Sequence, residues 1–133
     1  MDAQLREQVR QRAKLRCEYC HLPTRFAYRP FHIDHIVPEK HGGLTTPGNL
    51  ALACNSCNLR KGTNLSGIDP ATGGIVELFH PRKDRWADQF RYEQGALLGR
   101  TPVGRATIGV LGINEPHLVD LRMLLMEEGV SFD

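Results

Sequence analysis

Two groups of residues have the types and spacing to do chemistry: the adjacent pair Asp34-His35, and four cysteines arranged in two CxxC pairs. Hydrolysis of a phosphodiester needs a hard divalent cation, which prefers oxygen ligands, and a base that takes a proton from the attacking water. The carboxylate of Asp34 suits such a cation, and His35 is of the residue type that most often acts as such a base. An isolated Asp-His pair is a weak signal, so its meaning depends on the residues around it.

The cysteines predict a structural zinc site. They occur as Cys17-Glu-Tyr-Cys20 and Cys54-Asn-Ser-Cys57, with none left over. In a reducing compartment such pairs are typical of tetrahedral Zn²⁺, because four thiolates complete the coordination and leave no open position. Redox-active dithiols are the alternative. The pairs are separated by 33 residues, more than the usual spacing of about 15–20, so a folded insert must lie between them.

The spacing of apolar and turn residues predicts the helices and strands that position these residues. Residues 3–15 are predicted to be helical, with Leu5, Val9 and Ala13 as an apolar stripe. Residues 31–37 and 49–53 are predicted to be strands, separated by residues typical of turns. Helical spacing begins at Ser56, and Gly62 is a natural stop. The insert and the residues after it therefore form a β-hairpin and a helix, a ββα unit tied at its base by zinc.

Beyond Gly62 the chain is interpreted as supporting structure. Its predicted elements are a turn at 69–74, a strand at 75–79, a hairpin at 90–101 broken at Gly95, and helices at 102–111 and 115–128. Asn114 is a candidate cap for the last helix, and Phe79, Trp86 and Phe90 are expected in the core. Without an obvious linker, residues 1–133 are expected to form one domain, with 17–62 as the core and 63–133 as an extension.

The residues from Cys17 to Gly62 closely resemble the signature of HNH endonucleases. The matching stretches are Phe31-His-Ile-Asp34-His35-Ile-Val-Pro38, Gly42-Gly43, Asn49-Leu50 and Cys54-Asn-Ser-Cys57-Asn58-Leu-Arg-Lys61-Gly62. Residues 79–86 and 101–107 look like companions of this motif in bacterial stand-alone HNH proteins. The expected fold class is α+β: a ββα-metal (HNH) core stapled by a four-cysteine zinc site, with an N-terminal helix and a C-terminal α/β extension.

The resemblance implies a role for each matching position. Asp34 and Asn58 match the ligands of a catalytic metal, and His35 matches the general base that activates water. Asn49 matches the middle asparagine, which holds the hairpin loop and orients the base. Many HNH proteins carry histidine where this chain has Asn58, and an amide oxygen suits Mg²⁺ or Mn²⁺ better than Zn²⁺. One-metal hydrolysis that leaves 5′-phosphate and 3′-hydroxyl ends is the implied reaction.

Two further residues are candidates for phosphate contacts. Lys61 lies three residues after Asn58 on the same helical face, although an interaction with the helix dipole explains it equally well. His32 shares a strand face with Asp34 and is expected to contact the phosphate or assist the metal. Strict alternation also puts Asp34 and His35 on opposite faces, unless the strand twists or ends before Pro38.

Charge supports a polyanionic partner. Residues 1–62 contain ten Lys or Arg against five Asp or Glu, although the whole chain carries a net charge of only +2. Nucleic acid, with DNA favoured, is the expected partner. Arg6, Arg10 and Lys14 form a basic stripe on the first predicted helix, which is either a solvated face or a phosphate contact. No apolar run could span a membrane and no secretory signal is recognisable, so a cytoplasmic location is expected.

Two rival functions stay open. A non-catalytic zinc-ribbon module that binds nucleic acid would explain the cysteines and the basic charge, but it has no need for Asp34, His35 and Asn58 together. An HNH-fold subunit that mainly binds a partner would use the apolar stripe of the last predicted helix. The sequence predicts neither the oligomeric state nor the specificity of cleavage.

Overall fold

Short strands and helices alternate along the chain, and the strands form three separate two-stranded antiparallel sheets. The computed structural model describes residues 1–133. Its elements are α1 (Ala3–Arg12), η1 (Thr24–Phe26), β1 (His32–His35), η2 (Glu39–His41), η3 (Pro47–Asn49), β2 (Leu50–Ala53), α2 (Asn55–Lys61), β3 (Ser66–Ile68), β4 (Ile75–Glu77), α3 (Trp86–Gln89), β5 (Phe90–Glu93), β6 (Ala96–Gly99), α4 (Pro102–Leu111) and α5 (Pro116–Glu127). The predicted α+β class is confirmed.

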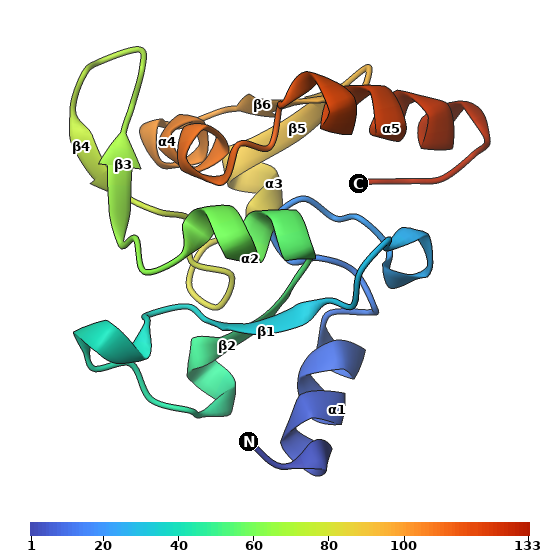
Figure 1. Cartoon of the computed structure of the whole chain (residues 1–133). Helices are drawn as coiled ribbons and strands as arrows, with labels where there is room; N and C mark the ends of the chain where they lie inside the picture. The colour runs from blue at the N-terminus through green and yellow to red at the C-terminus, as the bar shows by residue number, and fades with distance from the viewer.

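The predicted ββα unit is present, with shorter strands than the sequence suggests. β1 pairs with β2 so that Asp34 lies opposite Ala51 and His35 opposite Leu50. α2 begins directly after β2 because Cys54 caps it, accepting a hydrogen bond from the amide of Cys57. Figure 1 shows α2 between the hairpin and α1 on one side and the C-terminal elements on the other.

Helix α1 packs on one face of the hairpin. Val9 is fully buried against Leu50 and Leu52, and Leu5 and Ala13 lie beside them, as the apolar stripe predicts. The guanidinium of Arg12 donates to the carbonyl oxygens of Pro47 and Leu50, at 2.8 and 2.6 Å. The helix ends at Arg12 and not at residue 15, because residues 14 and 15 have left-handed backbone angles, which interrupt a right-handed helix.

The C-terminal extension follows the predicted order, with α4 and the β5–β6 hairpin as expected and with β3 and α3 as additions. The predicted cap is wrong: Glu115 occupies the N-cap of α5. Asn114 instead bonds the backbone N–H and C=O of Leu97, each at 2.8 Å, and so ties the hairpin to the start of α5. Phe79 and Phe90 are buried in the main core, and Trp86 packs against it. None of the helices has the length and apolar character needed to cross a membrane.

Candidate active site

The four cysteines converge on one point, as predicted. Their ligand atoms all lie within 4.8 Å of one another and every one of the four residues is buried. In each pair the second cysteine's backbone N–H points at the first cysteine's sulfur, from Cys20 to Cys17 and from Cys57 to Cys54, both at 3.4 Å. Hydrogen bonds among the sulfurs lower the pKa of the Cys54 thiol and raise the pKa of the Cys20 and Cys57 thiols. One thiolate is therefore favoured in the metal-free cluster, and metal binding would release protons from the others. Four soft donors in this arrangement fit a structural Zn²⁺.

The C-terminal extension supports the first cysteine pair. The hydroxyl of Tyr92 donates to the carbonyl oxygen of Cys20 at 2.6 Å. His21 stacks on Trp86 with 3.8 Å between the ring centroids, and its Nδ1 lies 2.8 Å from the carbonyl oxygen of Phe132. Burial lowers the pKa of His21. His21 therefore joins the knuckle to the C-terminal residues and is not a fifth metal ligand.

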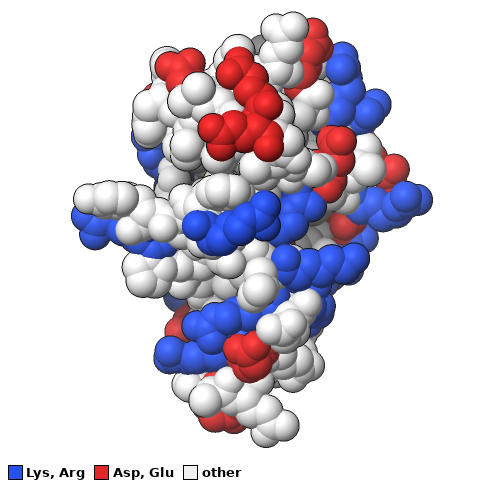
Figure 2. Space-filling view, turned by 90° about the vertical axis from the view of Figure 1, so that its right-hand side faces the viewer, with Lys and Arg blue, Asp and Glu red and all other residues white.

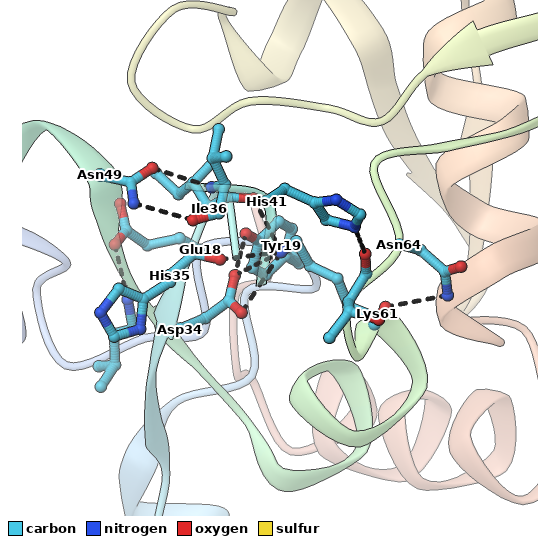
Figure 3. A network of polar contacts seen from close by, with 12 residues as sticks. Glu18, Tyr19, Asp34, His35, Ile36, His41, Asn49, Lys61 and Asn64 are labelled. Atoms are coloured by element: carbon cyan, nitrogen blue, oxygen red, sulfur yellow. Dashed lines mark hydrogen bonds and ion pairs between the residues drawn. The ribbon is translucent and has the colours of Figure 1, made fainter. Parts of the chain in front are cut away.

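Asp34 points into the protein. Both it and Lys61 are almost fully buried, at 6% and 1% exposure. Its Oδ2 accepts a hydrogen bond from the Tyr19 hydroxyl at 2.7 Å and lies 3.1 Å from Nζ of Lys61, while Oδ1 lies 3.3 Å from the same ammonium. Figure 3 shows the carboxylate directed toward these two partners. Burial raises the pKa of Asp34, and the Lys61 charge and the Tyr19 hydrogen bond oppose that rise.

The ammonium of Lys61 is completely engaged inside the unit. Besides Asp34, it donates to the carbonyl oxygens of His35 at 3.1 Å and Ile36 at 3.0 Å. These contacts fix the end of β1 against the last turn of α2. The phosphate contact expected of Lys61 stays a prediction, and in this structure the buried side chain turns toward Asp34 and away from solvent.

His35 faces the opposite side of β1, as regular alternation predicts. Its Nε2 lies 2.8 Å from Oγ1 of Thr45 and 3.9 Å from Oε1 of Glu39, and its side chain is 19% exposed. In Figure 3 the imidazole and the Asp34 carboxylate point away from each other. The two side chains therefore leave β1 on opposite faces.

Asn49 pins the hairpin loop. Its Oδ1 accepts from the backbone N–H of Val37 at 2.8 Å, and its Nδ2 donates to the carbonyl oxygens of Val37 and Leu44, at 3.0 and 2.8 Å. Gly43 passes so close that a Cβ there would overlap the carbonyl of Val37. These contacts hold the loop that carries Thr45, the hydrogen-bond partner of His35. The loop-holding part of the role expected for Asn49 matches this geometry.

His32 and Asn58 lie together at a different place, in a pocket of about 290 Å³ between α1 and α2. The pocket is lined by Met1, Arg6, Arg10, Phe31, His32, Ile33 and Asn58. His32 is exposed, and its Nε2 lies 3.1 Å from Oδ1 of Asn55 in the first turn of α2. His32 thus sits on the α2 side of β1, as its predicted face requires.

The arrangement does not fit a catalytic cation shared by Asp34 and Asn58. Both oxygens of Asp34 are held by Lys61 and Tyr19, and the residue is closed to solvent. Asn58 lines a pocket with two arginines, whose charge disfavours a cation. The four cysteines are the one group of His, Cys, Asp or Glu side chains with metal-binding geometry. The assignment of Asp34 and Asn58 as metal ligands stays a prediction.

Two residues of the site carry no clear sequence signal. Tyr19 lies inside the first CxxC pair and is given no role by the sequence analysis, yet its hydroxyl binds Asp34. Thr45 belongs to a run of turn residues, yet it is the hydrogen-bond partner of His35. Only the three-dimensional packing of the knuckle and the loop identifies them.

A β-hairpin followed by a helix, with four converging cysteines at its base that fit a structural Zn²⁺, defines a ββα unit. Residues 17–64 match the model of the HNH endonuclease family. This segment contains both cysteine pairs, β1, β2 and α2, so the family resemblance of the sequence is confirmed over the ββα unit. No curated protein and no solved structure gives a significant match to the chain.

Proposed function

We propose that the protein is an endonuclease that hydrolyses phosphodiester bonds in DNA, with His35 as the general base. The observation that carries this proposal is the position of His35: it lies on β1, inside the segment that matches the HNH endonuclease family, beside a loop pinned by Asn49. Its imidazole is partly exposed, so a water molecule and a phosphate can approach it.

The neighbours of His35 suit proton transfer. With Nε2 unprotonated, the imidazole accepts a hydrogen bond from the Thr45 hydroxyl, and an attacking water takes the place of that hydroxyl when substrate binds. The carboxylate of Glu39 lies 3.9 Å from the Nε2 that receives the proton. Lys61 and Asn49 act as positioning residues, since they bind the backbone of His35 and of the two residues that follow it.

The Asp34–Lys61 pair favours a second candidate, a zinc-stapled module that binds nucleic acid without cutting it. If Lys61 keeps the Asp34 carboxylate from a cation, the chain lacks one part of the chemistry that the HNH resemblance implies. The basic N-terminal half suits either function. The two candidates differ in whether His35 matters for a chemical step.

Cleavage of supercoiled plasmid by the zinc-loaded protein separates them. The wild type, His35→Ala and His117→Ala are compared with and without Mg²⁺ or Mn²⁺, because the family resemblance carries an expectation of one of these ions. His117 is exposed on α5 and serves as the matched control. Nicked or linear DNA from the wild type and His117→Ala, but not from His35→Ala, supports the endonuclease. Binding of DNA without cleavage by any variant supports the module that does not cut.

A further inference from the structure

The pocket that contains His32 and Asn58 lies along the free edge of β1. This strand pairs only with β2 in a two-stranded sheet, so its other edge is unpaired. Helix α1 contributes Arg6 and Arg10 to one wall, and α2 contributes Asn58 to the other. The pocket is therefore a groove of about 290 Å³ beside the strand that carries His35.

The charge of this pocket suits an anion. Arg6 and Arg10 are one helical turn apart, so their guanidinium groups leave α1 on the same side. No aspartate or glutamate lines the pocket, and His32 and Asn58 add groups that can donate hydrogen bonds. Figure 2 shows Lys and Arg side chains across the middle and lower half of the molecule, with a few Asp and Glu among them, whereas Asp and Glu are most numerous at the top.

The two arginines are free to bind a ligand, in contrast to others nearby. Arg12 and Arg16 use their guanidinium groups to bind backbone carbonyls of this chain. Arg6 makes no side-chain hydrogen bond or ion pair, and Arg10 has only a 3.8 Å contact with the exposed Glu7. An exposed pair of this kind contributes little and is easily exchanged for another anion.

We infer that this pocket binds a backbone phosphate of the nucleic acid, which makes Arg6 and Arg10 substrate-positioning residues. The inference rests on the proposed function and names the surface that holds its substrate. His32 precedes His35 by three residues, which corresponds to about 10 Å along a strand. The bound phosphate therefore lies at least this far from one beside His35, because the two histidines leave β1 on opposite faces. Arginine is suited to this task because its planar fork binds two phosphate oxygens at once.

The test compares Arg6→Gln/Arg10→Gln with Arg91→Gln, an exposed arginine in β5 that pairs with Glu93 on the surface. DNA binding is measured in the His35→Ala background, so that cleavage is not needed for the readout. The double variant is expected to weaken binding about tenfold at low salt and to reduce the slope of log K against log salt by about 1–2. In the cleaving protein, KM is expected to rise while kcat changes little.

Two outcomes would contradict phosphate binding by the pocket. Equal losses in the Arg91 variant would show a general effect of net charge, and wild-type binding by the double variant would show that the pocket holds no phosphate. If no variant cleaves DNA but the double variant alone loses binding, the inference stands and the proposed catalysis fails. Thermal unfolding of the double variant at the wild-type temperature confirms that the fold is intact.

Discussion

The ammonium of Lys61 lies 3.1 Å from Oδ2 of Asp34, and the pair is buried where the last turn of α2 meets β1. The same ammonium binds the carbonyl oxygens of His35 and Ile36. Each charge of the pair is compensated by the other inside the protein. Removal of either side chain therefore leaves the other charge buried and uncompensated. The pair thus joins the helix of the ββα unit to the strand that carries the proposed base.

Loss of one member of this pair is expected to destabilise the protein. Lys61→Met should lower the free energy of unfolding by about 3–5 kcal/mol, because Asp34 then stays buried without a counter-charge. The double variant Asp34→Asn/Lys61→Met should recover part of that loss, since neither charge is left alone. Urea denaturation with Zn²⁺ in excess measures both values.

The same variants test the metal assignment of Asp34. If Asp34→Asn kept wild-type stability and lost only the binding of Mn²⁺, measured by calorimetry, Asp34 would be a metal ligand and the buried ion pair would be incidental. Loss of stability without a change in Mn²⁺ binding would identify Asp34 as a structural partner of Lys61.

Removal of zinc is expected to unfold the ββα unit. The four buried cysteines are part of the main core, and the free energy of metal binding at such a site contributes to folding. Chelation, or the single change Cys57→Ala, should abolish the cooperative thermal transition and the dispersion of the amide NMR signals. Acid should also release zinc, because protons compete for the thiolates. A chain that keeps its native spectrum with no bound zinc would contradict this prediction.

Asn49→Ala is expected to loosen the hairpin loop. The substitution removes three hydrogen bonds and leaves the backbone N–H of Val37 without its acceptor. We expect a loss of about 1–3 kcal/mol in stability and faster hydrogen exchange at the Val37 amide. Gly48→Ala is the matched control, since a Cβ there meets open space. Unchanged exchange at Val37 would show that the loop does not depend on Asn49.

His32→Ala tests the phosphate contact predicted for this exposed histidine. The imidazole lines the pocket with Arg6 and Arg10, and its one hydrogen bond is to Asn55. DNA affinity should fall a few-fold with little change in thermal stability, because an exposed side chain contributes little to folding. Identical affinity, cleavage rate and metal dependence in the variant would exclude a role for His32.

The sequence predicts the ββα unit well because strong local signals mark its limits. The cysteine pairs fix the base, turn residues separate the strands, and Gly62 follows the helix with a positive φ. The extension is predicted in outline, although β3 and α3 are too short for periodicity to detect. Asn114 is a plausible cap by residue type, but its side chain binds Leu97, which lies 17 residues away in the sequence.

The candidate site is less predictable because side-chain direction depends on packing. Alternation along β1 predicts opposite faces for Asp34 and His35, and the structure has them so. The alternation does not predict that Lys61 extends from α2 to bind the Asp34 carboxylate. Motif position identifies Asp34 and Asn58 as one metal site, whereas the packing groups Asn58 with His32 and the arginines of α1. Which side chains come together depends on the distances between β1, α1 and α2, and a sequence motif carries no information about those distances.

The most direct test of the central claim is the single-turnover rate of DNA cleavage by His35→Ala, with and without added imidazole. If His35 is the general base, this variant cleaves about 10²–10⁴-fold more slowly than the wild type, and added imidazole partly restores the rate. The variant must keep its zinc and its melting temperature. A cleavage rate equal to that of the wild type, in the same folded variant, would contradict the assignment of His35 as the general base.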